Sequence, residues 1–319
     1  MRFNSSSMRP ILSVVICTFN RAQLLEMCLV SLSEQTASLQ EFEVIVVTNN
    51  CTDSTHEVAS KAKSYLPNLR AVNETAQGLS HARNRGAKEV HTDWVFYLDD
   101  DALADKDMVR NALTFIREVG GKIFGGQFKP WYHYGRTVWF KDEYGSSHLK
   151  HAQRTLLKAR GEFLTGGVFC VHVSLFEQFG GFDPLLGMNG LNVGYGEETE
   201  YQKVLRKNGV DVWYDPSIVI HHVVKPQLLN PEWHLTSGWA LGRDKVLSGN
   251  LPQAKFYLIT VAFTAVVITV KDALVNGAKL VLRKDYYPEN WWIDTFRKAA
   301  KRAAILYTAS LYPPKINRS

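Results

Sequence analysis

Short apolar runs alternate with amphipathic stretches along the first two thirds of the chain. Mostly apolar runs rich in Val, Ile and Phe predict buried β-strands, and apolar residues spaced three or four positions apart predict helices between them. After the first run, for example, Leu24, Leu25, Cys28 and Leu29 fall on one helical face. The predicted strands are residues 11–17, 42–47, 69–72 (weaker), 94–98, 123–128 and 168–173, with short late strands at 210–214 and 218–220.

The alternation of strand and helix predicts an α/β fold, with a mostly parallel sheet covered by helices on both faces. Short polar turns follow three of the predicted strands, at residues 18–21, 48–53 and 99–101. Ligands of open α/β sheets bind at the carboxyl ends of the strands, so we expect these turns to converge on one crevice. The turns lack the glycine patterns of dinucleotide-binding and P-loop proteins, which argues against both classes.

The segment 94–101 is apolar and aromatic until it ends in Asp99, Asp100 and Asp101. Unpaired charges are too costly to bury, so the three acids should lie at the edge of the sheet. Asp99 and Asp101, at alternate positions, are suited to hold a divalent cation together with phosphate oxygens. The alternative is a solvated turn at the end of the strand, in which Asp101 caps the helix expected over 106–119.

The second half of the predicted sheet region is less regular. Residues 130–160 are rich in aromatics and mixed charge, and predict a surface loop region. Residues 174–179 predict a short helix, and the glycine-rich run 187–196 predicts a mobile loop. Glu197 and Glu198 open a helix that continues to residue 208, and two histidines, His221 and His222, follow the last predicted strand.

Composition places the chain among ordinary globular proteins. Of 319 residues, 45% are hydrophobic and 21% charged, which gives no bias toward disorder. The four cysteines have no paired spacing, which favours reduced thiols and a cytosolic environment over disulfides or a zinc site. Residues 1–10 read as an N-terminal tail without the apolar segment of a secretory signal.

The positive charge belongs to the end of the chain. Residues 271–319 hold ten Lys and Arg against four Asp and Glu, a surplus of six that equals the net charge of the whole chain. Residues 1–270 are therefore balanced, which argues against a nucleic-acid-binding core. The basic tail is instead suited to an anionic surface such as a membrane.

Residues 226–319 predict a C-terminal helical region. The uncharged run 256–270 would form a helix of only about 22 Å, shorter than the roughly 30 Å hydrocarbon core of a bilayer. We therefore expect a buried or interfacial helix rather than a membrane span. Trp291, Trp292 and Phe296 beside Arg297 and Lys298 suit an anionic membrane interface. The alternative is a helical pair that packs on the sheet domain with a solvated basic face.

Taken together, the segments resemble the inverting family 2 glycosyltransferases of GT-A fold (a Rossmann-like architecture). The resemblance covers about residues 11–225, the expected catalytic domain, and its motifs occur in the family's order. They are residues 14–21, 46–53, the G-x-x-x-A-R-N run 78–84, the D-x-D motif within 98–101, and the acceptor-side segments 180–183 and 196–198. Thr48 stands where the family usually has an Asp that reads the nucleotide base.

The resemblance implies a Mn²⁺ or Mg²⁺ ion held by Asp101, with Asp99 as the second choice of ligand or as the residue that holds the ribose or a metal-bound water. It implies a late histidine as a further ligand, with His221 favoured over His222; the alternative is a purely structural histidine. It implies Glu198 as the catalytic base, with Glu197 beside it as the other candidate; both also suit the first turn of a helix. The residues expected to bind the donor nucleotide are Thr18, Asn20, Arg21, Asn49, Asp53, Arg83, Asn84, Asp99 and Asp100, although Thr18, Asn20 and Asn49 are equally suited to forming turns.

The expected activity is transfer of a sugar from a nucleotide-sugar, a UDP-sugar by preference, to a saccharide or lipid-linked acceptor. Polysaccharide or glycolipid assembly at the cytoplasmic face of the cell membrane, with the protein bound peripherally, fits the basic tail. Two alternatives stay open: a sugar nucleotidyltransferase, and a non-catalytic, membrane-tethered sugar-binding protein. The first lacks its usual Gly-rich, Lys-containing phosphate loop here.

Overall fold

The computed structural model describes residues 9–159, 161–190, 192–248 and 255–311, so most of the predicted N-terminal tail lies outside the described residues. The chain divides into two compact units. The sheet unit comprises Met1–Trp131, Gly145–Pro184 and Glu197–Val223, and the helical unit comprises Tyr132–Tyr144, Leu185–Gly196 and Val224–Ser319.

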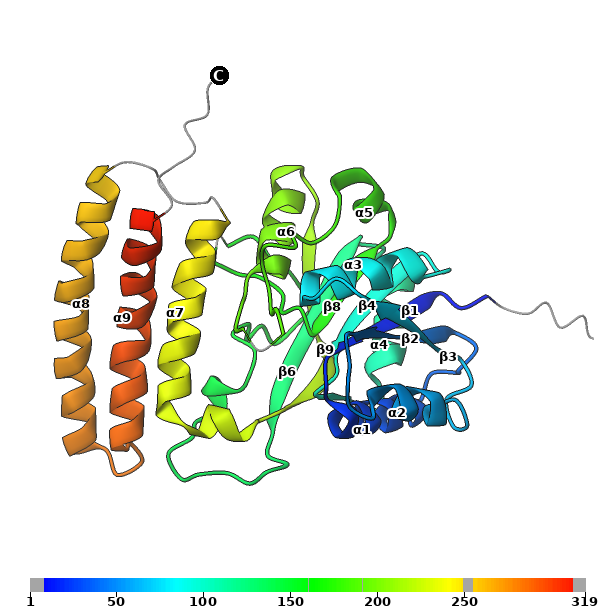
Figure 1. Cartoon of the computed structure of the whole chain (residues 1–319), viewed down its shortest axis with the longest axis horizontal. Coiled ribbons are helices and arrows are strands. Elements are labelled where there is room, and N and C mark those ends of the chain that lie inside the picture. Colours follow the sequence, from blue (N-terminus) through cyan, green and yellow to red (C-terminus); the bar gives the residue numbers. More distant parts are fainter. Residues whose placement is uncertain (1–8, 160, 191, 249–254, 312–319) are drawn as a thin grey trace, which may run out of the picture. The chain divides into compact units, whose positions relative to one another are not determined.

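The sheet unit is built on one mixed β-sheet (Figure 1). The strand order is β3-β2-β1-β4-β8-β6-β9-β5, and β7 pairs with β9. The strands are β1 Leu12–Thr18, β2 Phe42–Asn49, β3 Leu69–Glu74, β4 Trp94–Asp99, β5 Ala102–Ala104, β6 Ile123–Trp131, β7 Thr155–Leu156, β8 Val168–His172 and β9 Val212–Val223.

The predicted α/β fold is confirmed, and the parallel part of the sheet is confined to one half. Strands β3, β2, β1 and β4 run parallel, whereas β8 is antiparallel to both β4 and β6. Strand β9 is parallel to β6 and antiparallel to β5 and β7. The predicted mostly parallel sheet therefore holds for residues 12–99 and gives way to mixed pairing beyond them.

Helices cover both faces of this sheet, as the alternating pattern predicted. On one face, α1 (Ala22–Ser33), α2 (Thr55–Ala62) and α4 (Met108–Glu118) pack on Val14, Val44 and Phe96. On the other, α3 (Leu79–Glu89), α5 (Ser174–Phe179) and α6 (Glu197–Lys207) pack on Val15, Ile45 and Tyr97. Side chains alternate between faces along a strand, so the continuous apolar runs of β1, β2 and β4 fill both cores.

Strand β9 differs from the prediction of two late strands. It runs unbroken for 12 residues, through Asp215 and Pro216. Its pairing with β6 shifts register between Gly125 and Gln127, and a side chain at Gly126 would overlap the backbone of Ile218. This irregularity absorbs the Asp-Pro interruption that suggested a break between strands.

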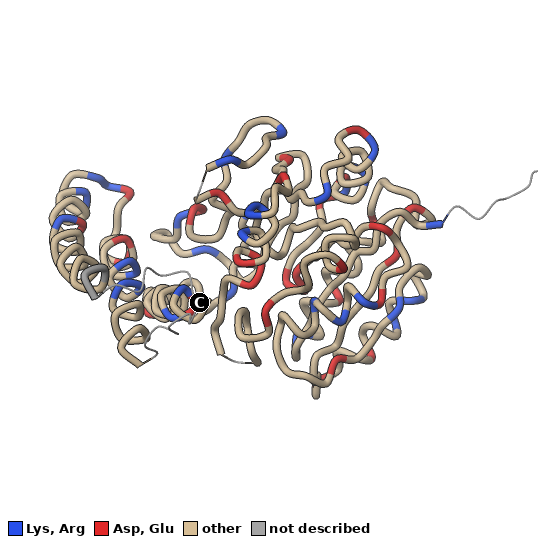
Figure 2. Tube along the Cα trace, turned by 90° about the horizontal axis from the view of Figure 1, so that it is seen from above, with Lys and Arg blue, Asp and Glu red and all other residues tan. Residues whose placement is uncertain are grey.

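Acidic and basic residues are interspersed over the sheet unit (Figure 2), in keeping with the balanced charge of residues 1–270. All four cysteines are free thiols, and Cys28 and Cys170 are buried in the core.

In the helical unit, α9 (Pro288–Leu311) lies between α7 (Pro231–Leu247) and α8 (Lys255–Leu282) (Figure 1). Gly238 and Gly242 let α7 approach α9 closely, because a side chain at either would overlap the α9 backbone at Arg297 or Lys301. The segment 132–144, which contains a short 3₁₀ turn at Asp142–Tyr144, belongs to this unit. A second 3₁₀ turn, Pro226–Leu229, precedes α7.

Helix α8 is longer than the helix predicted over 256–270. Lys271 and Asp272 do not end it, and it continues to Leu282, for about 42 Å at 1.5 Å per residue. Its segment Leu258–Leu282 is long and apolar enough to cross a membrane by length and composition, with a mean hydropathy of 2.0 in its most apolar window. None of that window is buried in the described structure, so the expectation of a buried helix is wrong.

Candidate active site

The three aspartates lie where two parallel strands end. Asp99 is the last residue of β4 and is in register with Cys17, next to the end of β1. Asp100 and Asp101 follow, and the chain then enters the short strand β5. The carboxylates of Asp100 and Asp101 are almost fully buried, whereas that of Asp99 is partly exposed. Asp107, not Asp101, precedes helix α4, so the capping alternative for Asp101 is not supported.

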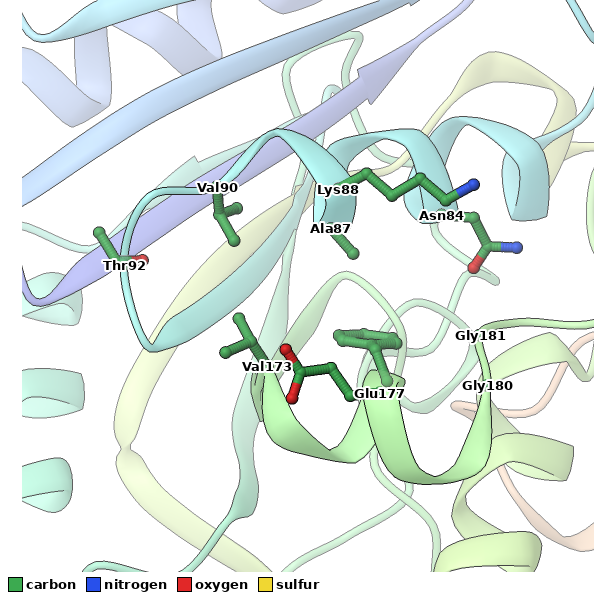
Figure 3. A pocket seen from close by; sticks show the side chains of 10 residues that line it. Asn84, Ala87, Lys88, Val90, Thr92, Val173, Glu177, Gly180 and Gly181 are labelled. Atoms are coloured by element: carbon green, nitrogen blue, oxygen red, sulfur yellow. The ribbon is translucent and has the colours of Figure 1, made fainter.

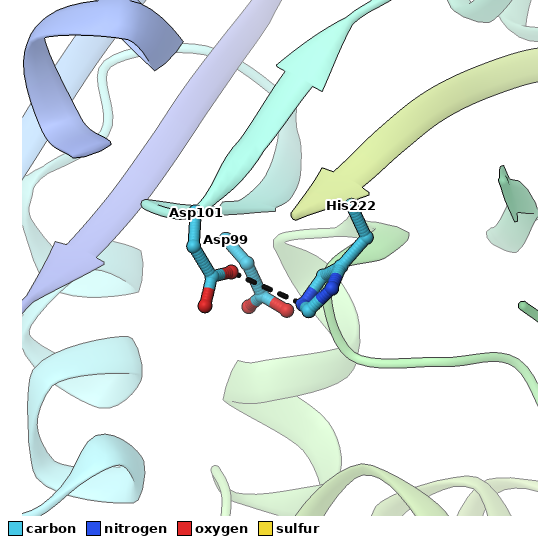
Figure 4. A group of neighbouring side chains, drawn as sticks. All are labelled: Asp99, Asp101 and His222. Atoms are coloured by element: carbon cyan, nitrogen blue, oxygen red, sulfur yellow. Dashed lines mark ion pairs between the residues drawn. The ribbon is translucent and has the colours of Figure 1, made fainter. Parts of the chain in front are cut away.

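His222 faces Asp99 and Asp101 across this strand end (Figure 4). Its Nε2 lies 3.1 Å from Asp101 Oδ1, and one ligand atom from each of the three residues lies within 4.8 Å of the others. Two carboxylates and one imidazole at this spacing fit a single divalent cation. Because Mg²⁺ prefers oxygen ligands only, the imidazole favours Mn²⁺ or another first-row metal.

The structure brings His222, and not the predicted His221, together with Asp99 and Asp101. Adjacent residues of a strand point to opposite faces of a sheet. In β9, His222 is opposite Ala102 of β5, and the backbone N–H of Val223 donates to the carbonyl oxygen of Asp101. His221 therefore faces away, with its Nε2 3.5 Å from Asp105 Oδ2.

Arg21 neutralises the two buried aspartates. Its Nη1 lies 2.8 Å from Asp100 Oδ1 and 3.2 Å from Asp101 Oδ2. The negative charge of Asp100 raises the pKa of Arg21 further, so the guanidinium stays charged. The turn after β1 thus delivers a fixed positive charge to the acidic turn after β4, as the convergence of strand ends predicted.

Arg83 connects the aspartates to the acidic start of α6. It is almost fully buried, with Nη1 2.6 Å from Glu197 Oε1 and Nη2 3.4 Å from Asp99 Oδ1. Its guanidinium lies over the rings of Tyr97 and Phe182, at 5.8 and 5.7 Å from their centroids. Burial lowers the pKa of Arg83, but the carboxylates of Glu197 and Asp99 raise it by more, so it stays protonated.

Glu197 and Glu198 occupy the first turn of α6. Glu197 is buried against Arg83, whereas Glu198 is partly exposed. Burial and the neighbouring charge of Glu197 raise the pKa of Glu198 to about 8, although Arg83 opposes this effect. A carboxylate with a pKa near 8 is a stronger base than an ordinary glutamate, and acid–base catalysis works best when that value lies near the working pH.

Two glycines that the sequence reasoning did not single out shape this site. Gly166 and Gly167 come directly before β8. A Cβ at Gly166 would lie 2.6 to 2.9 Å from the guanidinium atoms of Arg83, and one at Gly167 would overlap the carboxylate of Asp99. The backbone thus packs directly against both charged groups. The sequence signal for this close packing is the pair of glycines directly before a buried strand.

Four of the expected nucleotide-binding residues hold turns together. Asn20, with a positive φ of 52°, accepts from the backbone N–H of Thr52 at 2.7 Å. Asp53 accepts from the backbone N–H groups of Ala22 and Thr55, at the starts of α1 and α2. The other two are Asn49 and Asn84.

Asn49 and Asn84 each clamp a loop. The Asn49 amide donates to the carbonyl oxygens of Glu74 and Ala76, and its oxygen accepts from Gln77 and from the backbone N–H of Gly78. The side chain of Asn84 exchanges two hydrogen bonds of 2.8 Å with the backbone of Phe182. Their use as direct nucleotide contacts stays a prediction, as does that of Thr18, whose buried hydroxyl has no hydrogen-bond partner among the described residues.

A separate hollow of about 610 Å³ lies between α3 and α5 (Figure 3). Asn84, Lys88, Glu177 and Gly181 are among the residues that line it. Asn84 therefore points toward this hollow, whereas its neighbour Arg83 points to the aspartates.

Comparison with known proteins identifies the family. Residues 13–180 match the family described as Glycosyl transferase family 2. This match covers more than half of the chain, which therefore belongs to that family. The glycosyltransferase AglE of Haloferax volcanii is 24% identical over 270 residues, which cover 79% of this chain and 85% of AglE. The chain is thus a glycosyltransferase.

Two solved structures share the fold. The mannosyltransferase PcManGT from Pyrobaculum calidifontis, in complex with GDP-Man and Mn²⁺, has a TM-score of 0.61 at 19% identity, over 93% of this chain and 87% of that chain. S. aureus TarS 1-349 in complex with UDP-GlcNAc has a TM-score of 0.54 at 17% identity, over 93% of this chain and 84% of that chain. These likenesses confirm the GT-A-type α/β fold.

Proposed function

We propose that this glycosyltransferase moves a sugar from a nucleotide-sugar to a saccharide or lipid-linked acceptor with inversion at the anomeric carbon. The observation that carries the proposal is the line of charged groups Asp101–Asp99–Arg83–Glu197, which runs from a candidate metal site to a candidate base. One end of this line suits the diphosphate of a donor, and the other suits the hydroxyl of an acceptor.

At the donor end, Asp99, Asp101 and His222 would hold a divalent cation, which supplies charge neutralisation to the departing diphosphate when bound. Arg21 holds Asp100 and Asp101 in place from the opposite side. The Mn²⁺ bound to the mannosyltransferase PcManGT supports this cofactor by analogy of fold.

At the acceptor end, Glu198 would take the proton from the acceptor hydroxyl. The hydroxyl oxygen then bonds to the anomeric carbon from the face opposite the diphosphate, and the carbon–oxygen bond to the diphosphate breaks, with its electron pair leaving on the diphosphate. Glu197, fixed by Arg83, would position the start of α6 and maintain the raised pKa of Glu198.

We propose a UDP-sugar as the donor, because S. aureus TarS 1-349, which shares the fold, binds UDP-GlcNAc. Thr48 has a hydroxyl, which donates to Val72 O and Asn73 Oδ1, in place of the base-reading carboxylate usual in the family. PcManGT binds GDP-Man, so GDP-sugars are the class to test against UDP-sugars. The setting that we propose is polysaccharide or glycolipid assembly on the cytoplasmic face of a membrane.

The test is a panel of UDP- and GDP-sugars assayed for release of the nucleoside diphosphate, with Mn²⁺, with Mg²⁺ and with a chelator. We expect metal-dependent hydrolysis of a UDP-sugar, and a loss of at least about 100-fold in Asp101→Asn, because the ion loses a charged ligand. Metal-independent turnover that Asp101→Asn leaves intact would contradict the metal assignment. Absence of donor binding by calorimetry would favour the non-catalytic alternative, and pyrophosphate exchange would favour the nucleotidyltransferase.

A further inference from the structure

Helix α8 carries an apolar stripe on its exposed side. Residues recur three, four or seven positions apart, which places them on one side of a helix. Each has between 55% and 85% of its surface exposed, and the stripe extends for about 33 Å at 1.5 Å per residue. Its members are Ile259, Phe263, Val266, Val270, Leu274 and Val281.

We propose that α8 lies in the plane of a membrane, with this stripe embedded in the acyl chains of one leaflet, and does not cross the bilayer. The proposal rests on the membrane location proposed above, and it is independent of the reaction. It assigns a lipid bilayer as the partner of the stripe.

The first four turns of α8 suit hydrocarbon better than water. Residues 256–270 carry no charge on any side of the helix. The hydroxyls of Thr264 and Thr269 donate to the carbonyl oxygens of Thr260 and Ala265, one turn back, at 2.7 and 2.6 Å. These polar groups are thus satisfied within the helix and need no water.

The same run argues against a second copy of the chain as the occupant. Helices that pair through an apolar seam in water are usually flanked by charged residues that set register and solubility. Residues 256–270 offer none. The charges lie instead beyond this run, where Lys271 and Lys284 are exposed and suit anionic lipid headgroups, whereas Arg283 is paired with Asp285.

The opposite side of α8 explains why it should not span the bilayer. There Asp272 lies 3.8 Å from Lys298 of α9, and Asn276 donates to the Thr295 hydroxyl at 3.2 Å. Helix α9 also carries Arg297, Lys301 and Arg302 along this stretch. A transmembrane hairpin of the two helices would bring these charges into hydrocarbon, which is costly. An in-plane α8 leaves them in water.

The first experiment is flotation of the full chain with vesicles of phosphatidylglycerol and phosphatidylcholine. The stripe variant is Phe263→Glu with Val270→Glu. The matched control is Val138→Glu with Leu185→Glu, at positions of the helical unit that are 80% and 79% exposed. We expect the parent and the control to float with the vesicles and to stay bound during carbonate extraction. The vesicle-bound fraction of the stripe variant should be at least about tenfold lower than that of the parent.

Donor hydrolysis by all three proteins reports whether the sheet unit is intact. If none of the three hydrolyses a donor, that result contradicts the proposed reaction and leaves the proposal for α8 unchanged. Flotation of the stripe variant equal to that of the parent would overturn the proposal. So would a parent that does not float but is dimeric by light scattering and becomes monomeric in the stripe variant, because the occupant would then be a second copy.

The second experiment separates the in-plane from the spanning arrangement. Lys284→Cys, beyond the end of α8, and His56→Cys, on the exposed surface of α2, are labelled with a membrane-impermeant maleimide on protein bound to the outside of sealed vesicles. The parent chain gives the background from its own cysteines. We expect both sites to react fully. Protection of the Lys284→Cys site that detergent relieves would show that α8 crosses the bilayer.

Discussion

At the scale of single residues, Arg83 is the cation that the two halves of the site share. Its guanidinium contacts Asp99 of the donor side and Glu197 of the acceptor side, and it is held between two aromatic rings and the backbone at Gly166. A buried charge is tolerated only when it is paired in this way. The position of one side chain therefore sets the positions of carboxylates on two different elements.

The raised pKa of Glu198 predicts the pH dependence of transfer. The base works only when it has lost its proton, so activity should increase about tenfold per pH unit below a pKa of about 8 and level off above it. Glu198→Gln should lower kcat by about 10² to 10⁴ without weakening donor binding. The measurement is kcat/KM for transfer against pH.

Glu197→Gln is the informative companion. It removes the neighbouring charge that raises the pKa of Glu198, so kcat/KM should reach its plateau at a lower pH than in the parent enzyme. An inactive Glu197→Gln beside an active Glu198→Gln would reassign the base to Glu197.

The two histidines of β9 give a matched pair for the metal site. His222→Ala should raise the Mn²⁺ concentration for half-maximal activity at least about tenfold, because one of three protein ligands is lost. His221→Ala should leave it unchanged, because His221 faces Asp105. The measurement is donor hydrolysis against Mn²⁺ concentration, and equal effects of the two substitutions would contradict the assignment.

The place of the acids at the strand ends could be predicted from the sequence, because unpaired carboxylates are too costly to bury in an apolar core. The burial of Asp100 and Asp101 could not, because it depends on their pairing with Arg21. The choice between His221 and His222 could not, because it depends on the pairing of β9 with β5, a three-residue strand without a sequence signal. Asn20, Asn49 and Asp53 lie in the predicted turns, but their hydrogen bonds tie turn to turn. Residue type alone does not separate these two uses of an amide or carboxylate.

At the scale of elements, the start of β8 shapes the donor side of the site. Gly167→Ala would force the Asp99 carboxylate to move, because the added Cβ overlaps it. We expect a loss of about 100-fold in metal-dependent donor hydrolysis, since displacements near 1 Å at a reacting site cost that much. Gly161→Ala is the control, because its Cβ would meet no atom within 4 Å.

Circular dichroism and thermal unfolding should be alike for Gly161→Ala and Gly167→Ala. Full metal-dependent donor hydrolysis in Gly167→Ala would show that this activity does not depend on the position of the Asp99 carboxylate in the structure.

The central strands of the parallel half, β1, β2 and β4, were predictable because each is mostly apolar and buried. The later elements were harder to place. Strand β9 includes Asp215 and Pro216, which break the apolar pattern, and α8 continues through Lys271 and Asp272 because one charged turn does not end a helix. The pattern therefore divided one strand into two, and it made the helix too short.

At the scale of the whole molecule, the boundary predicted at residue 225 lies close to the change of unit at Val224. The assignment of 132–144 and 185–196 to the helical unit was not predictable, because it depends on contacts between residues far apart in sequence. The amide of Asn290 donates to Trp139 O at 2.6 Å, and Asp294 accepts from Lys141, Tyr144 and Tyr286. No local sequence pattern predicts these contacts.

The aromatic cluster of the helical unit bears on how the protein is made. Trp139 and Phe140 pack with Val224 and Ile293, so their partners leave the ribosome at least 80 residues after them. Until α9 is synthesised, Ile293 is missing from this cluster, and the two rings are covered only in part by residues nearer in sequence such as Tyr132 and Tyr144. A chain that ends at residue 223 would keep every residue of the candidate site, but Trp139 and Phe140 would lack their contacts with Val224 and Ile293 and would stay exposed. Solubility, more than activity, would then decide whether the sheet unit can be studied by itself.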